Sequence, residues 1–282
     1  MELLENLRDI LLELKVGILN PTWIIMRMKY RFEHFRPKTA IDASSYPEVS
    51  QLRSKGIVTE FNLTSKQKAE IWNYALNTPC YGHRKLNKTF QFRYGDSHQF
   101  TTAHYFNTQQ DCPTINELCK DSRILAIAKE FLGGEPVLLG TTLWWSFANT
   151  SMALNNSSRR RFGQSFHYDL DGGATLKFFF YLTDVDLESG PHVIVQNSAR
   201  KKPLIFQIRP RGWTETKLKR YYQAEDFLTI IGSAGFGFIE NPFCFHRGIP
   251  PLTKDRLMLC LNYGLVNYRQ QHDLKKLSNR VF

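Results

Sequence analysis

The chain has 282 residues, of which 42% are hydrophobic and 13% aromatic, so it can bury a large core and is not a disordered or low-complexity sequence. Its five cysteines are odd in number and form no Cys-x-x-Cys pair, which argues against a disulfide framework or a zinc knuckle. We expect them to be buried, unpaired residues of a cytoplasmic protein. The formal net charge of +11 favours anionic partners.

The N-terminal segment, residues 1–35, is predicted to be helical. Its first leucines follow a helical spacing: Leu3, Leu4, Leu7, Leu11 and Leu14. Charged residues interrupt this pattern, so the segment is neither a signal peptide nor a bilayer span. We expect a helix packed on the domain or on a partner subunit. A peripheral membrane contact is the alternative, because Trp23 and the basic residues after it suit a membrane surface. Residues 36–282 are expected to form one domain.

The next part of the chain alternates predicted strands and helices. Strands are expected at 56–62, 137–139 and 142–147, and helices at 65–77 and 115–132. The second helix is predicted from apolar residues that recur with the period of an α-helix. We find no internal repeat and no long linker in this region, which favours a single folding unit.

The most informative motif is His167, Tyr168, Asp169. Residues two apart on a strand share a face, so His167 and Asp169 project together. His246 follows Asp169 by 77 residues, enough chain for several strands to bring it to the same interior. Two imidazoles and one carboxylate are the facial triad that holds non-haem Fe(II) and leaves three positions open. For His-x-Asp alone, an exposed turn or a His–carboxylate hydrogen bond is the alternative.

Arg256 stands about one strand beyond His246, where a 2-oxoglutarate carboxylate would be bound. Its planar donor fork matches a carboxylate, so we expect it to pair with the distal end of that co-substrate. The keto-acid end would chelate iron next to O2. Gln164 and Lys177 are further candidates for cofactor contacts. The alternatives for these two are a strand-end hydrogen bond and an exposed strand residue.

The residues around these motifs form strand patterns separated by turn signals. Core strands are expected near 164–169, 175–183, 192–196, 227–231, 235–239 and 256–263. On a regular last strand, Arg256 shares a face with Met258, Cys260 and Asn262. This order predicts a mainly β protein with flanking helices outside one sheet. Its core is expected to be a double-stranded β-helix, a jelly roll of the cupin type.

Several of these motifs, in this order, resemble the phytanoyl-CoA dioxygenase family of Fe(II)/2-oxoglutarate-dependent oxygenases. The resemblance covers roughly residues 140–265. It is carried by residues 164–169, 176–186, 189–191, 235–240, 245–251 and 255–259. One departure is Ala199, which follows Ser198 where members carry a His. That position is not a metal ligand in the family pattern, so the triad is intact.

The resemblance implies an Fe(II)/2-oxoglutarate-dependent dioxygenase that hydroxylates an unactivated C–H bond and releases succinate and CO2. Ascorbate is an open option as reductant. Desaturation, epimerisation or ring formation at the same site is one alternative. A non-catalytic jelly-roll protein that binds a metal or another ligand is the other. The family does not name the substrate, because function belongs to the site and its loops.

Basic clusters occur at 159–161, 200–202, 217–220 and 275–276. The first two lie close in sequence to the histidine motif and its following hairpin, so they are expected to attract an anionic substrate. We therefore expect a small-molecule or carrier-linked substrate that is anionic. A nucleic-acid partner is not expected, because no nucleic-acid motif is recognisable and the basic residues are dispersed. Whether the protein forms an oligomer is left open.

Overall fold

The computed structural model describes residues 45–93, 100–148, 165–169, 175–203, 206 and 212–267. The helices are α3 (Pro47–Lys55), α4 (Ser65–Asn77), α5 (Thr108–Asp111), α6 (Pro113–Leu118), α7 (Ser122–Leu132), α10 (Glu215–Leu218) and the 3-10 turn η2 (Ala224–Asp226). The strands are β1 (Ile57–Thr59), β2 (Cys80–Gly82), β3 (Thr89–Phe90), β4 (Thr102–His104), β5 (Val137–Ser146), β6 (Thr175–Tyr181), β7 (His192–Val195), β8 (Phe227–Ile230), β9 (Gly237–Glu240), β10 (His246–Gly248) and β11 (Arg256–Gly264). Four predicted features lie outside the described residues: the segment 1–35, the basic clusters 159–161 and 275–276, and Gln164.

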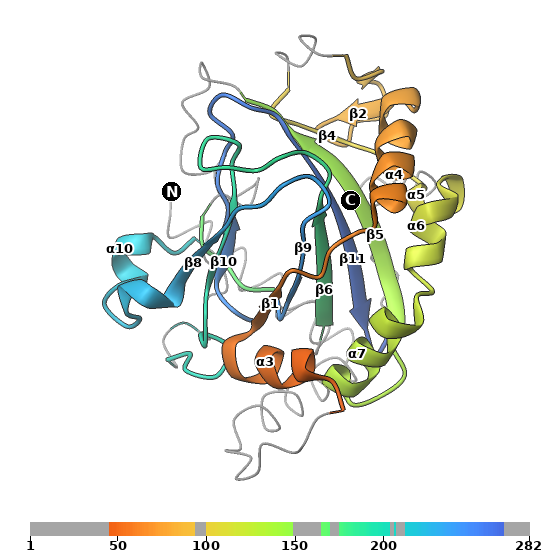
Figure 1. The fold of residues 1–282 in the computed structure, drawn as a ribbon. Coiled ribbons are helices and arrows are strands. Elements are labelled where there is room, and N and C mark those ends of the chain that lie inside the picture. The colour runs from red at the N-terminus through yellow and green to blue at the C-terminus, as the bar shows by residue number, and fades with distance from the viewer. Residues whose placement is uncertain are drawn as a thin grey trace, which may run out of the picture.

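Two antiparallel sheets form the body of the protein (Figure 1). The larger has eight strands in the order β1-β9-β6-β11-β5-β4-β2-β3, and the smaller has the order β10-β7-β8. The strand expected near 164–169 is not formed over the described residues 165–169, which make only isolated bridges, from Phe166 to Trp213 and from His167 to His246. The bridge to His246 attaches this segment to β10 of the smaller sheet. Strands that are distant in sequence lie side by side, as β11 does with β5 and β6. The mainly β, jelly-roll architecture predicted from the sequence is therefore confirmed.

The two faces of the large sheet carry different residues because side chains alternate along a strand. On β11, Leu257, Leu259 and Leu261 belong to the core beneath the helices. Met258 and Cys260 belong to a second core, which lies between the two sheets. We call the face that points to the small sheet the inner face. The predicted alternation along β11 is confirmed.

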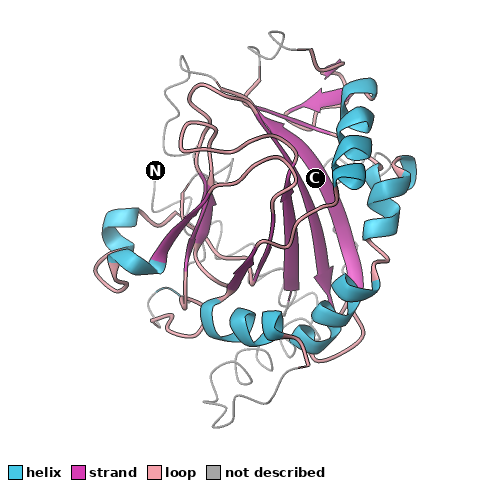
Figure 2. Cartoon of the chain, in the orientation of Figure 1, coloured by secondary structure: helices cyan, strands magenta, loops and turns pink. Residues whose placement is uncertain are grey.

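Helices α3, α4, α6 and α7 cover the outer face of the large sheet (Figure 2). Helix α7 buries Ile124, Ile127 and Phe131 on one side, which is the apolar stripe expected of a surface helix. Helix α4 spans the predicted residues because Thr64 and Gln67 form a capping box at its start. The helices thus leave the inner face to the site.

Several predicted elements are wrong in their boundaries, and the strand expected at 56–62 is only Ile57–Thr59. The helix expected over 115–132 is two helices, because the Asp121 side chain accepts hydrogen bonds from the backbone N–H groups of Arg123 and Ile124, both at 2.9 Å. This cap starts α7 and separates it from α6. The strands expected at 137–139 and 142–147 are one strand, β5, with a register shift opposite Asn262 and Tyr263. The pattern also missed α3 and the short strands β2, β3, β4 and β10.

All five cysteines are free and buried, as the sequence indicated. Within the described ranges, no helix is both long enough and apolar enough to cross a membrane.

Candidate metal centre

Backbone pairing brings together two histidines from distant parts of the chain. His167 donates its N–H to the carbonyl of His246 at 3.0 Å, and His246 donates to the carbonyl of His167 at 2.8 Å. A reciprocal pair of this kind sets the residues directly opposite each other with their side chains on one face. The two imidazole centroids accordingly lie 4.4 Å apart.

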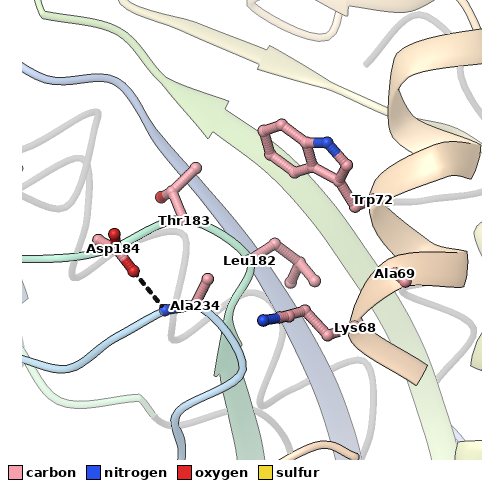
Figure 3. Close-up of a pocket in the computed structure, with 7 residues that line it drawn as sticks. All are labelled: Lys68, Ala69, Trp72, Leu182, Thr183, Asp184 and Ala234. Atoms are coloured by element: carbon pink, nitrogen blue, oxygen red, sulfur yellow. Dashed lines mark hydrogen bonds between the residues drawn. The ribbon is translucent and has the colours of Figure 1, made fainter. Parts of the chain in front are cut away.

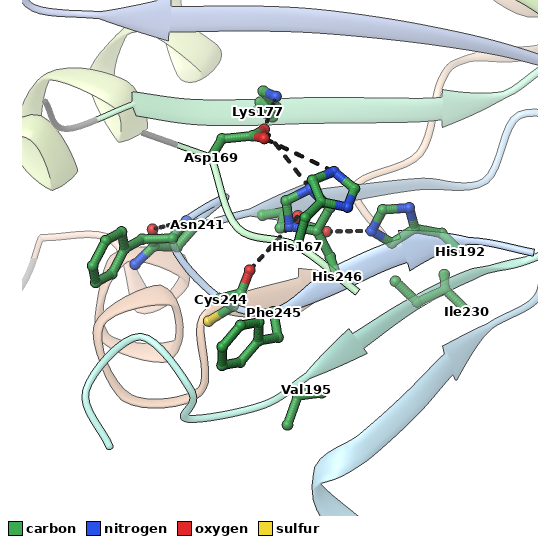
Figure 4. Close-up of polar contacts among 12 residues, drawn as sticks. His167, Asp169, Lys177, His192, Val195, Ile230, Asn241, Cys244, Phe245 and His246 are labelled. Atoms are coloured by element: carbon green, nitrogen blue, oxygen red, sulfur yellow. Dashed lines mark hydrogen bonds and ion pairs between the residues drawn. The ribbon is translucent and has the colours of Figure 1, made fainter. Parts of the chain in front are cut away.

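Asp169 completes the cluster. Its N–H donates to the carbonyl of Pro242 at 2.8 Å, which keeps it beside the segment that leads to His246. Its Oδ1 lies 3.9 Å from Nε2 of His167, and its Oδ2 lies 3.7 Å from Nε2 of His246. One potential ligand atom from each of the three residues lies within 4.8 Å of the others (Figure 4). The predicted ligands therefore converge, and their binding of a metal stays a prediction.

The second ring nitrogens show that both histidines fit a metal. Nδ1 of His167 lies 3.0 Å from the carbonyl of Ser165, and Nδ1 of His246 lies 3.0 Å from the carbonyl of Cys244. A carbonyl only accepts, so each Nδ1 carries the hydrogen and each Nε2 keeps a free lone pair. Both lone pairs are on the side where Asp169 lies. This donor set, two neutral imidazoles and a carboxylate, fits a divalent transition metal.

Lys177 lies on the inner face of β6 and pairs with Oδ2 of Asp169. Burial raises the pKa of Asp169, but the charge of Lys177, joined by those of His246 and His167 when these are protonated, outweighs it and holds that pKa well below its usual range. Asp169 is thus ionised at neutral pH, as a metal ligand must be. The alternative that Lys177 is an exposed strand residue is wrong. Its contact with 2-oxoglutarate stays a prediction.

Arg256 is 4% exposed at the start of β11. Its guanidinium donates to the carbonyl of Gly190 and, at 3.1 Å, to Oγ of Ser146. Its Nε is buried and makes no hydrogen bond to any residue that the structure describes. A β-carbon at Gly248 would lie 3.5 Å from Nη2, so this glycine brings only backbone to the guanidinium. A buried cation with an unused donor is what an anionic co-substrate requires.

The sequence interpretation missed a buried carboxylate behind His246. Glu240, on β9, is 0% exposed. Its Oε2 lies 2.6 Å from Nε2 of His192, and its Oε1 lies 3.0 Å from Nδ1 of His246. Burial raises the pKa of Glu240 to about 6, and burial lowers those of His246 and His192 to about 4 and about 3. Both Glu240 and His192 lie in otherwise apolar strand segments, so the only sequence signal for a functional role is a polar residue at a buried position.

The loop that departs from the family pattern supports the strand segment of His246. Oγ of Ser198 accepts a hydrogen bond from the N–H of Phe245 at 2.7 Å and donates to the carbonyl of Val195 at 2.6 Å. Ser198 therefore ties the end of β7 to the residue that precedes His246. Ala199 is buried beside it.

The basic cluster at 200–202 is not a uniformly solvated rim. Lys202 is 3% exposed, and its ammonium lies over the rings of Phe245 at 3.6 Å and Tyr168 at 3.9 Å. Burial holds the pKa of Lys202 well below its usual value. Arg200 and Lys201 are exposed, so they alone in this cluster can attract an anion from solvent.

A pocket of about 430 Å³ lies between α4 and two segments, one after β6 and one before β9 (Figure 3). Its lining is Lys68, Ala69, Trp72, Leu182, Thr183, Asp184 and Ala234. Trp72 packs edge-on against Trp145 in the core beneath the helices, with ring centroids 5.8 Å apart. The pocket is thus lined by none of the predicted site residues.

Neither a protein-family model nor a curated protein matches the sequence. The resemblance to the phytanoyl-CoA dioxygenase family is therefore not confirmed at the level of that family.

Solved structures do match the fold. The non-heme alpha ketoglutarate dependent epimerase SnoN from nogalamycin biosynthesis aligns with a TM-score of 0.54 and 17% identity, covering 77% of this chain and 81% of SnoN. HygX from Streptomyces hygroscopicus, with nickel, 2-oxoglutarate and hygromycin B bound, gives 0.52 and 14%, covering 78% and 87%. EctD from S. alaskensis, with 2-oxoglutarate and 5-hydroxyectoine, gives 0.52 and 14%, covering 84% and 85%. At these identities, the comparison shows a shared fold.

Proposed function

We propose that this protein is an Fe(II)- and 2-oxoglutarate-dependent oxygenase. One observation carries the proposal: His167, Asp169 and His246 converge within 4.8 Å in a protein whose inner face also holds the buried guanidinium of Arg256. The three solved neighbours support the same cofactors. SnoN is named as alpha ketoglutarate dependent, and the HygX and EctD structures contain 2-oxoglutarate. A further EctD structure contains Fe.

Each side chain has a defined task in this proposal. Nε2 of His167, Nε2 of His246 and a carboxylate oxygen of Asp169 would hold Fe(II) on one face. Arg256 would bind the distal carboxylate of 2-oxoglutarate, with Ser146 holding the guanidinium in place. With 2-oxoglutarate and O2, bound iron supplies an oxidant for unactivated C–H bonds, and succinate and CO2 are released. The buried inner face around Met258 would exclude water from the reacting groups.

For the reaction itself, we propose hydroxylation of a small or carrier-linked anionic substrate in the cytoplasm. The exposed Arg200 and Lys201 support an anionic substrate, since they follow β7 of the sheet that bears His246. Epimerisation is the second candidate, because SnoN carries that description. The phytanoyl-CoA dioxygenase family is the affiliation that the sequence motifs favour.

The proposal is tested by titrating 2-oxoglutarate into the anaerobic Fe(II) protein. Chelation of iron by the keto acid should produce a visible metal-to-ligand absorption band that saturates at one equivalent per chain. The same titration without Fe(II) should give no band. If wild-type protein binds Fe(II) but never develops the band, the 2-oxoglutarate part of the proposal fails. If it binds no Fe(II), the metal centre itself fails.

A further inference from the structure

Glu240 and His192 form a buried pair that joins the two sheets next to the proposed metal ligand. Glu240 is on β9 of the large sheet, and His192 is on β7 of the small sheet. Their 2.6 Å contact is enclosed by Phe179 and Phe238, whose rings lie 5.4 and 5.3 Å from the His192 ring. A carboxylate in such apolar surroundings is costly unless a specific partner compensates it.

The second oxygen of Glu240 is directed at the proposed ligand. Oε1 lies 3.0 Å from Nδ1 of His246, the same distance as the Cys244 carbonyl that receives the Nδ1 hydrogen. Oε1 accepts no hydrogen bond from the described part of the chain. Its contact with the His246 ring is therefore electrostatic. In Figure 4, His192 and His246 lie on adjacent segments, and their ring centroids are 5.6 Å apart.

The charged side chains around the three proposed metal ligands explain how the contact between Glu240 and His246 would favour a cation. Lys177 pairs with Asp169 and is also the cross-strand neighbour of Glu240. Asp169 and Lys177 alone would cancel, leaving no net negative charge to receive a divalent cation. Glu240 adds a negative charge beside His246, at a position that no solvent reaches and where charge interactions are strong.

We propose that Glu240, held by His192, is a positioning residue for His246 in metal binding. Its carboxylate fixes the imidazole plane and stabilises the positive charge that the ring gains when Nε2 donates to a cation. Carboxylate–histidine–metal arrangements of this kind strengthen the histidine as a ligand. The inference rests on the proposed function, because it requires His246 to be a ligand.

The test compares wild type with Glu240→Gln, which keeps the side-chain shape and removes the charge. Co(II) is the probe, because its visible spectrum reports ligand geometry without turnover. We expect Glu240→Gln to weaken Co(II) binding by about 10- to 100-fold and to shift the Co(II) bands. Glu240→Asp retains the charge but withdraws it from Nδ1, so its affinity should fall between those of Glu240→Gln and wild type. Cys260→Ala, a buried change on the same inner face, should keep wild-type affinity.

The thermal unfolding midpoint of each metal-free variant shows whether Glu240 positions His246 or only stabilises the contact between the two sheets. A Glu240→Gln protein that loses thermal stability but binds Co(II) with wild-type affinity and unshifted bands overturns the inference. If Glu240→Gln does not fold, wild-type affinity in Glu240→Asp overturns it equally. Failure of wild-type protein to bind Co(II) would instead refute the proposed metal centre.

Discussion

The backbones of His167 and His246, 79 residues apart in sequence (246 − 167), exchange two hydrogen bonds of 3.0 and 2.8 Å. This pairing fixes where the two imidazoles stand before any metal arrives. Asp169 joins them because it lies two residues after His167 and its N–H donates to the carbonyl of Pro242 at 2.8 Å. The centre is therefore built largely by backbone register, and its side chains need only small movements to close on an ion.

The first prediction concerns the ligands. Asp169→Ala and His246→Ala should each abolish stoichiometric binding of Fe(II), because two remaining donors hold a divalent ion weakly. Anaerobic equilibrium dialysis with iron analysis measures this directly. His83→Ala is the matched control, because His83 bonds to Thr101 outside the cluster. Full binding by His246→Ala would show that the third ligand lies elsewhere.

The second prediction concerns Arg256. Truncating a buried charge pair costs about 2–5 kcal/mol, so Arg256→Ala should weaken 2-oxoglutarate binding by at least about 30-fold while Fe(II) binding is retained. The midpoint of the visible-band titration reports the affinity. Arg123→Ala, a change at an exposed arginine, serves as control. An unchanged midpoint in Arg256→Ala would place the carboxylate contact on another residue.

Lys177 gives a prediction with opposite signs for two quantities. Lys177→Met leaves the Asp169 carboxylate uncompensated, so the metal-free protein should lose about 3 kcal/mol of unfolding free energy. The same change removes a positive charge next to the ion, so Fe(II) or Co(II) affinity should rise. Urea denaturation and metal titration measure the two effects. Weaker metal binding in Lys177→Met would contradict the charge assignment, and a shifted 2-oxoglutarate midpoint would indicate a direct contact.

The stability of the metal-free protein should fall as pH drops from 6.5 to 5. Burial lowers the pKa values of His192 and His246 to about 3 and about 4, so below 6.5 the unfolded chain binds more protons at these residues than the folded chain does. Each histidine contributes up to about 1.4 kcal/mol per pH unit. Glu240, with its pKa raised to about 6, takes up a proton in the folded chain below that pH, and this offsets the contribution of one histidine.

Urea denaturation at several pH values measures this dependence. Below pH 6, the slope of the unfolding free energy against pH should correspond to about one proton. The unfolded chain binds two more protons at the histidines, and the folded chain binds one more at Glu240. Saturating Co(II) should steepen the slope, because metal binding requires neutral imidazoles. Stability that is constant or that rises on acidification would show that these histidines are not buried in the neutral form.

Local sequence patterns predicted much of the fold and which three residues converge at the candidate site. The alternation of apolar residues predicted the inner and outer faces of β11, and the two-residue spacing placed His167 and Asp169 on one face. Asp121 is a helix N-cap residue, and this signal in the sequence divides the segment 115–132 into two helices. The pairing of Glu240 with His192 could not be read in this way. It depends on contact between two sheets, and a strand pattern does not specify which distant strand faces it.

The most direct measurement is succinate formation from 2-oxoglutarate under air, followed by mass spectrometry with Fe(II), ascorbate and a panel weighted toward anionic compounds. Wild-type protein should release succinate slowly alone and faster with a suitable substrate, whereas His246→Ala should not exceed the iron-only background. Iron-loaded wild-type protein that makes no more succinate than His246→Ala, with or without every panel member, would contradict the oxygenase proposal and leave a protein that only binds metal.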